Sequence, residues 1–162
     1  MMDRISRWLS QGAMYLSAAG LVAMMLIICW QVFARYVLHA APAWTEQSAL
    51  YLMLWFIIFA AAAGVRESFH IRLSLLQDTS PPRRRKALRL FCHGVVGVFA
   101  AFMLVAGGQL VAATWQHDIP TLGLPRGSAY LPIPISGAMI VFFSLEHILS
   151  EWQGREVAPL WN

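Results

Sequence analysis

The sequence predicts an all-α integral membrane protein with four transmembrane helices and both termini in the cytoplasm. Of the 162 residues, 59% are hydrophobic and 12% are charged, whereas about a quarter of the residues in a soluble domain are charged. Four stretches of 27, 19, 28 and 19 residues contain no Asp, Glu, Lys or Arg. Because a helix rises about 1.5 Å per residue, roughly 20 apolar residues cross the hydrocarbon core of a bilayer. These observations exclude a soluble enzyme and a secreted disulfide scaffold.

The whole chain, residues 1–162, is expected to form one membrane domain. The expected spans cover about 8–34, 47–65, 90–117 and 134–149. The first and third are each about 40 Å long if fully helical, so they must tilt or extend into the headgroups. The fourth is placed after Pro132 because this residue and Pro134 would interrupt a helix near its start. Tryptophans favour the edges of the hydrocarbon core, and five lie at predicted boundaries: Trp8, Trp30, Trp44, Trp115 and Trp152.

A dense basic block directly precedes the third span. It consists of Arg83, Arg84, Arg85, Lys86 and Arg89. Such a block can contact nucleic acid, but positive residues beside membrane helices normally stay in the cytoplasm, and we interpret it as topology-setting. The N-terminus, the connection 66–89 and the C-terminal tail hold ten Lys and Arg in total, against two in the other connections. This imbalance predicts that both termini are cytoplasmic.

The connection between the second and third spans contains an apolar arm over about residues 67–79. Phe69, Leu73 and Leu76 share one face of a helix, which predicts a short amphipathic helix on the cytoplasmic surface. The alternation of apolar and polar residues from Phe69 to Leu75 fits a strand equally well by pattern. The membrane context favours the helix.

The spans carry few groups that could bind ions or redox cofactors. No Asp, Glu, Lys or Arg lies deep in any span, which argues against a protein that moves ions by itself. The five histidines are expected near the two membrane surfaces, with Glu146 and His147 at the cytoplasmic interface, so no pair is placed to hold a central haem. HExxH and CxxC motifs are absent. No metal and no cofactor is expected.

The remaining polar and small residues of the spans are expected to pack helices. Gln109, inside the third span, is expected to bond another helix. Trp55, near the middle of the second span, either faces lipid or anchors on another protein. Pairs of small residues spaced by four let helix backbones approach closely. Three such pairs are Ala60 and Gly64, Gly97 and Ala101, and Gly108 and Ala112.

Several motifs follow one another in a specific order along the chain. They are Gln31-Val32-Phe33-Ala34-Arg35-Tyr36-Val37-Leu38, Trp44-Thr45-Glu46, Arg66, His70-Ile71-Arg72 and Leu122-Gly123-Leu124-Pro125. In order and spacing they resemble the small (Q-type, DctQ-like) permease subunit of tripartite ATP-independent periplasmic (TRAP) transporters. The resemblance covers most of the chain and agrees with its length and its four-span layout.

The resemblance implies partner or interface contacts at a small set of residues. They are Arg35, Trp44, Glu46, Gln47, Arg66 and His70. The alternative is that these side chains only anchor helices at headgroup level. The family typically has a second acid after the tryptophan motif and an acid shortly after the His-Ile motif, where this chain has Gln47 and Ser74. Roles that depend on those carboxylates are therefore not assigned.

The resemblance also implies a function: sodium-coupled uptake of organic acids (carboxylates) across the bacterial inner membrane. A periplasmic substrate-binding protein captures the substrate, and a large multi-span (M-type) subunit translocates it with sodium. This chain is then a scaffold in the phospholipid bilayer for the large subunit, with no substrate site, enzymatic activity or nucleic-acid partner of its own. The alternatives are an unrelated four-helix membrane assembly protein, an autonomous small transporter and a redox subunit.

Overall fold

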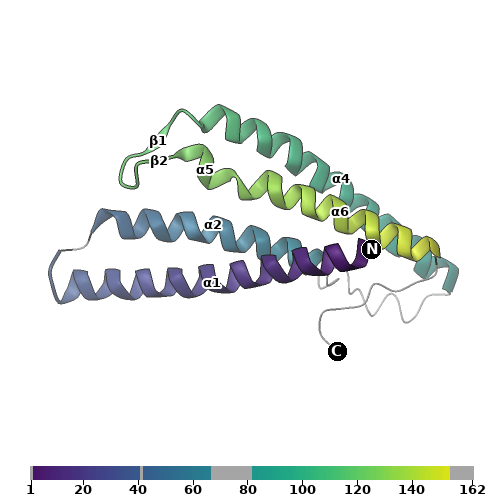
Figure 1. The fold of residues 1–162 in the computed structure, drawn as a ribbon, viewed down its shortest axis with the longest axis horizontal. Coiled ribbons are helices and arrows are strands. Elements are labelled where there is room, and N and C mark those ends of the chain that lie inside the picture. The colour runs from purple at the N-terminus through teal and green to yellow at the C-terminus, as the bar shows by residue number, and fades with distance from the viewer. Residues whose placement is uncertain (1, 41, 67–81, 154–162) are drawn as a thin grey trace.

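The computed structural model describes residues 2–40, 42–66 and 82–153 (Figure 1). In this part of the chain the long helices are α1 (Met2–Tyr36), α2 (Ala43–Arg66), α4 (Pro82–Thr114) and α6 (Pro132–Gln153). Each of these helices holds a segment long and apolar enough to cross a membrane. The fourth segment also includes the short helix α5 (Arg126–Tyr130), which precedes α6. The all-helical fold with four long apolar helices is therefore confirmed. The predicted arm at 67–79 lies outside the described residues.

The helices form two hairpins that lie side by side (Figure 1). The first hairpin consists of α1 and α2, and the second of α4 and α6. A small ribbon joins α4 to α5, in which β1 (Asp118–Ile119) pairs antiparallel with β2 (Leu124–Pro125). Gly123 occupies the turn of this ribbon with a φ of 62°, and its N–H donates to the carbonyl of Ile119 at 2.9 Å. Glycine adopts this left-handed conformation without the steric cost that a side chain would bring.

Small and hydroxyl-bearing residues pack α1 against α2. The buried face of α1 carries Ser6, Ser10, Ala13 and Ser17. The Ser17 hydroxyl lies 2.9 Å from the carbonyl oxygen of Phe56 in α2 and 2.8 Å from that of Ala13. Gly20 lies close to the same phenylalanine, whose Cβ would be 3.0 Å from a Cβ on the glycine. Small residues and hydroxyl bonds are the usual means of bringing membrane helices together.

Glycines bring α4 and α6 equally close. A Cβ on Gly137 would lie 2.8 Å from the backbone nitrogen of Leu104, and a Cβ on Gly97 would lie 2.9 Å from the Ser144 hydroxyl. The close-packing role predicted for Gly97 is therefore confirmed. A Cβ on Gly108 would have nothing within 4 Å, so the spacing of Gly108 and Ala112 does not mark a contact within the described residues.

In the described residues, the buried apolar clusters shared by the two hairpins lie towards one end of the bundle. We call this the Arg66 end, where α2 and α6 end and α4 begins, and we call the opposite end, with connections 37–42 and 115–125, the loop end (Figure 1). Two buried apolar clusters join the hairpins, and their α2 members all lie between Phe59 and Val65, in the last eight residues of that helix. Met139 of α6 packs against both clusters. Towards the loop end the ribbons of the two hairpins diverge (Figure 1), and α5 still contacts α2 there.

Two local expectations are not met within the described residues. Helix α6 begins at Pro132 and includes Pro134, because a proline in the first turn removes an N–H that has no partner inside the helix. Gln109 is exposed and makes no hydrogen bond to another helix within the described residues, so a bond to a helix of a partner stays a prediction.

Trp55 lies at the inner side of α2, and neither of the two roles considered for it describes its surroundings. Its ring stacks on Tyr51 at 6.1 Å and lies 5.9 Å from the ring of Phe59. It also packs against the cluster formed by Ala13, Phe59 and Ala63. Trp55 therefore belongs to the interior of the bundle, at the edge of the core that joins the hairpins.

Candidate functional site

Arg66 is a buried cation at the end of α2, with only 2% of its surface exposed. Its Nε donates a hydrogen bond of 2.9 Å to the hydroxyl of Ser6 in α1. Removing a guanidinium from water is costly unless its donors are satisfied. The position of Arg66 is therefore coupled to that of the first turns of α1.

Two histidines extend this polar contact to the second hairpin. The Nε2 atom of His147 in α6 lies 3.0 Å from the carbonyl oxygen of Arg66. The ring of His147 stacks on that of His93 in α4, with centroids 4.6 Å apart and an angle of 3° between the planes. The Ser144 hydroxyl in turn donates to the carbonyl of His93. All four long helices thus contribute to one group, Ser6, Arg66, His93, Ser144 and His147, which we call the polar cluster.

Carboxylates lie around the polar cluster in two different environments. Glu146 is 6% exposed, and its Oε2 atom has no hydrogen-bond partner among the described residues. Glu151 is partly exposed and forms an ion pair of 2.9 Å with Arg89. This ion pair links α4 to α6, so one member of the predicted basic block also ties the second hairpin together.

The geometry of the polar cluster does not fit a haem or metal centre. Two rings stacked face to face at 4.6 Å leave no space for an iron porphyrin between them, and axial ligation requires nitrogens that point at the metal. The described residues contain no group of three or more His, Cys, Asp or Glu side chains arranged to hold a metal ion. The cluster is arranged to connect helices.

The other predicted contact residues lie at the loop end or outside the described chain. Arg35, Trp44, Glu46 and Gln47 are exposed around the α1–α2 connection, and no ion pair joins the arginine to the glutamate within the described residues. Between them Thr45 is fully buried, and its hydroxyl donates to the carbonyl of Pro42 at 2.7 Å.

The remaining predicted residues are placed only in part. His70 lies outside the described residues, and the basic block occupies the first turns of α4, where Lys86 is exposed. The structure thus separates Arg66 from Arg35, Trp44, Glu46 and Gln47 by the length of α2.

Four members of the polar cluster were not among the predicted contact residues: Ser6, His93, Ser144 and His147. The sequence contained a pattern that could have indicated Ser6. Ser6, Ser10 and Ser17 recur at spacings of four and seven, which places them on one helix face. The histidines and Ser144 offered no comparable pattern. Their meeting depends on how α4 and α6 are rotated against each other.

The sequence comparisons agree with this membrane-embedded helical fold. Residues 24–154 match the family model described as "Tripartite ATP-independent periplasmic transporters, DctQ component". The chain is 25% identical to the sialic acid TRAP transporter small permease protein SiaQ of Vibrio cholerae, over 80% of this chain and 75% of that protein. It is 23% identical to the C4-dicarboxylate TRAP transporter small permease protein DctQ of the same organism, over 89% and 72%.

A third relative is much longer than this chain. The isethionate TRAP transporter permease protein DctMQ of Oleidesulfovibrio alaskensis is 26% identical over 141 residues, which are 82% of this chain and 22% of that protein. The fold and these matches define a multi-pass membrane component of a transporter, not an enzyme. The chain belongs to the DctQ family of small permease subunits of TRAP transporters.

Proposed function

We propose that this small permease is the membrane scaffold of a sodium-coupled, binding-protein-dependent uptake system for organic acids. In this proposal a large M-type permease subunit carries the substrate and sodium sites, a periplasmic protein delivers the substrate, and the complex lies in the bacterial inner membrane with the Arg66 end facing the cytoplasm. The relatives are named for sialic acid, C4-dicarboxylate and isethionate. All three are organic anions.

One observation carries the scaffold proposal: Arg66 and Arg89, both at the Arg66 end of the bundle, connect helices. Arg66 bonds α1, and Arg89 bonds Glu151 across α4 and α6. Ion-coupled transporters keep ionisable residues in the membrane interior where ions and substrates pass. Here the described spans contain no Asp, Glu, Lys or Arg between their ends, which supports a division of labour in which the ion and substrate sites belong to the partner.

The thin shape of the bundle also supports a role beside a larger protein. Most of the large apolar side chains of α1 and α4 are exposed along the length of these helices. Such surfaces are stable only against lipid or against other membrane helices. The match to about a fifth of a much longer permease supports a large membrane partner on one of these faces.

Reconstitution into liposomes tests this proposal. The full chain, its co-purified large subunit, and both together are assayed for uptake of an organic acid, with the binding protein present and a sodium gradient applied. We expect uptake only when both membrane subunits are present. Uptake by this chain alone would refute the scaffold role, and full uptake by the large subunit alone would show that the scaffold is not required.

A further inference from the structure

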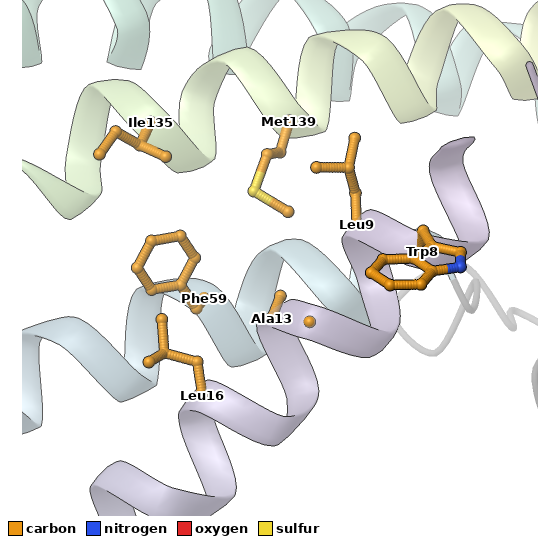
Figure 2. A pocket seen from close by; sticks show the side chains of 8 residues that line it. Trp8, Leu9, Ala13, Leu16, Phe59, Ile135 and Met139 are labelled. Carbon is orange, nitrogen blue, oxygen red and sulfur yellow. The ribbon is translucent and has the colours of Figure 1, made fainter. Parts of the chain in front are cut away.

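An apolar groove of about 650 Å³ lies between the two hairpins near the Arg66 end. Figure 2 shows its walls: Trp8 and Leu16 come from α1, Phe59 from α2, and Ile135 and Met139 from α6. The side chains of both hairpins point into the shared space, and α2 closes the back of the groove (Figure 2).

The lining of the groove selects a hydrocarbon ligand. Every residue that lines it is glycine or has an apolar or aromatic side chain, so a polar or charged ligand would lose its hydrogen bonds to water without replacement. A long apolar chain, in contrast, loses no hydrogen bonds there and makes van der Waals contacts with the lining.

The depth of the groove matches one leaflet of a bilayer. Leu16 lies ten residues beyond Ser6 in α1, and Ile135 lies twelve residues from His147 in α6, so the groove reaches about 15–18 Å from the polar cluster along the helices. Half of the hydrocarbon core is about 15 Å thick. A transmembrane helix of a partner would continue past this depth along α1, whereas a lipid of one leaflet ends near the midplane.

The mouth of the groove has the features of a headgroup site. Trp8 is 81% exposed and stands at the outer end of the groove, where an indole ring favours the membrane interface. Arg7, also exposed, directly precedes it. Lys86, in the first turns of α4, is exposed at the same end of the bundle. This charge complements a phosphate.

From these observations we propose that the groove between α1 and α6 holds one phospholipid of the leaflet at the Arg66 end, with an acyl chain between Leu16 and Met139 and the phosphate beside Trp8. The lipid would fill the space between the hairpins that protein side chains leave open. The proposal requires only that the chain spans a membrane, so it stands or falls separately from the scaffold role.

Gly12 provides a way to fill the groove without disturbing the protein. It lines the groove, and a Cβ on it would have nothing within 4 Å. Gly108 of α4 offers the same open space but lies outside the groove, so Gly108→Leu is the matched control for Gly12→Leu. Thermal unfolding in detergent should change by the same amount in the two variants, because each replaces a helical glycine that has open space around it.

Native mass spectrometry of the full chain, purified in mild detergent and incubated with phosphatidylglycerol, measures the lipid that it retains. We expect one lipid on the wild type and on Gly108→Leu. We expect this lipid to be lost from Gly12→Leu, because the leucine side chain takes the space of the acyl chain. Diacylglycerol, which has no phosphate, should be retained less than phosphatidylglycerol. Equal retention by Gly12→Leu, or equal retention of both lipids, would overturn the proposal.

Photocrosslinking in native membranes separates a lipid from a protein occupant. A benzophenone amino acid in place of Leu16 should give an adduct with the mass of a phospholipid. An adduct with a polypeptide would overturn the proposal and assign the groove to a partner helix.

Discussion

At the two ends of the bundle, polar residues are held in opposite ways. At the Arg66 end, Arg66 and His147 are buried and bonded across helices. At the loop end, Arg35 and Glu46 flank one short connection, are exposed, and form no ion pair with each other within the described residues. A buried polar group contributes to the stability of the fold because leaving it unpaired is costly, whereas an exposed one contributes little. The Arg66 end therefore holds the hairpins together, and the loop end presents side chains to the surroundings.

The largest expected effect on stability comes from replacing Arg66, the buried arginine of the Arg66 end. Arg66→Ala removes the hydrogen bond from Nε to the Ser6 hydroxyl and truncates a side chain that is only 2% exposed, so we expect a loss of about 2–3 kcal/mol in the free energy of unfolding. Denaturant unfolding in detergent measures it. Arg35→Ala is the control at the loop end and should change stability by less than about 0.5 kcal/mol. Equal effects of the two substitutions would contradict the comparison.

The second prediction concerns the close packing of α4 and α6. In Gly137→Ala the new methyl group would lie 2.8 Å from the backbone nitrogen of Leu104 and 3.0 Å from the carbonyl oxygen of Ala100. Backbone atoms cannot rotate away, so the helices must separate, at an expected cost of about 2 kcal/mol. Gly108→Ala, with open space, should be neutral or slightly stabilising. A neutral Gly137→Ala would show that these helices pack less closely than described.

A smaller effect is expected at the contact between the hairpins. His147→Phe keeps an aromatic ring to stack on His93 but removes the Nε2 atom that lies 3.0 Å from the Arg66 carbonyl. We expect a loss of about 1 kcal/mol, typical of one hydrogen bond between membrane helices. His117→Phe, which changes an exposed histidine at the loop end, is the matched control. Thermal unfolding measures both variants. A lower stability of His147→Phe alone would assign the contact to the hydrogen bond, and unchanged stability of both would assign it to the ring stack.

The smallest effect on stability is expected at the loop end, together with an effect on assembly. Trp44→Ala and Glu46→Gln change exposed side chains and should alter the free energy of unfolding by less than about 0.5 kcal/mol. If this end contacts a partner, the same variants should recover less of the large subunit in affinity purification from native membranes. Unchanged recovery together with unchanged stability would leave these residues as headgroup anchors.

The sequence predicted the fold class and the family but only part of the polar cluster. Arg66 was singled out by the family motif, whereas His93 and His147 were recognised only as residues near the same membrane surface. Their ring stack has no signature in a spacing along the chain. Gln109, a polar residue within an apolar span, was expected to bond another helix and is exposed in this chain, so only a helix of a partner can meet that expectation.

Local properties explain what the sequence determined by itself. The four long apolar helices follow from hydropathy and from the spacing of charges, since a bilayer requires about 20 apolar residues in each span. The tertiary structure decided which residues meet: Ser6 reaches Arg66 across 60 positions, and His147 reaches the same residue across 81. It also made Gly137 a close contact and left Gly108 open. Such choices depend on the rotation of each helix about its axis, which packing between distant segments fixes and composition does not.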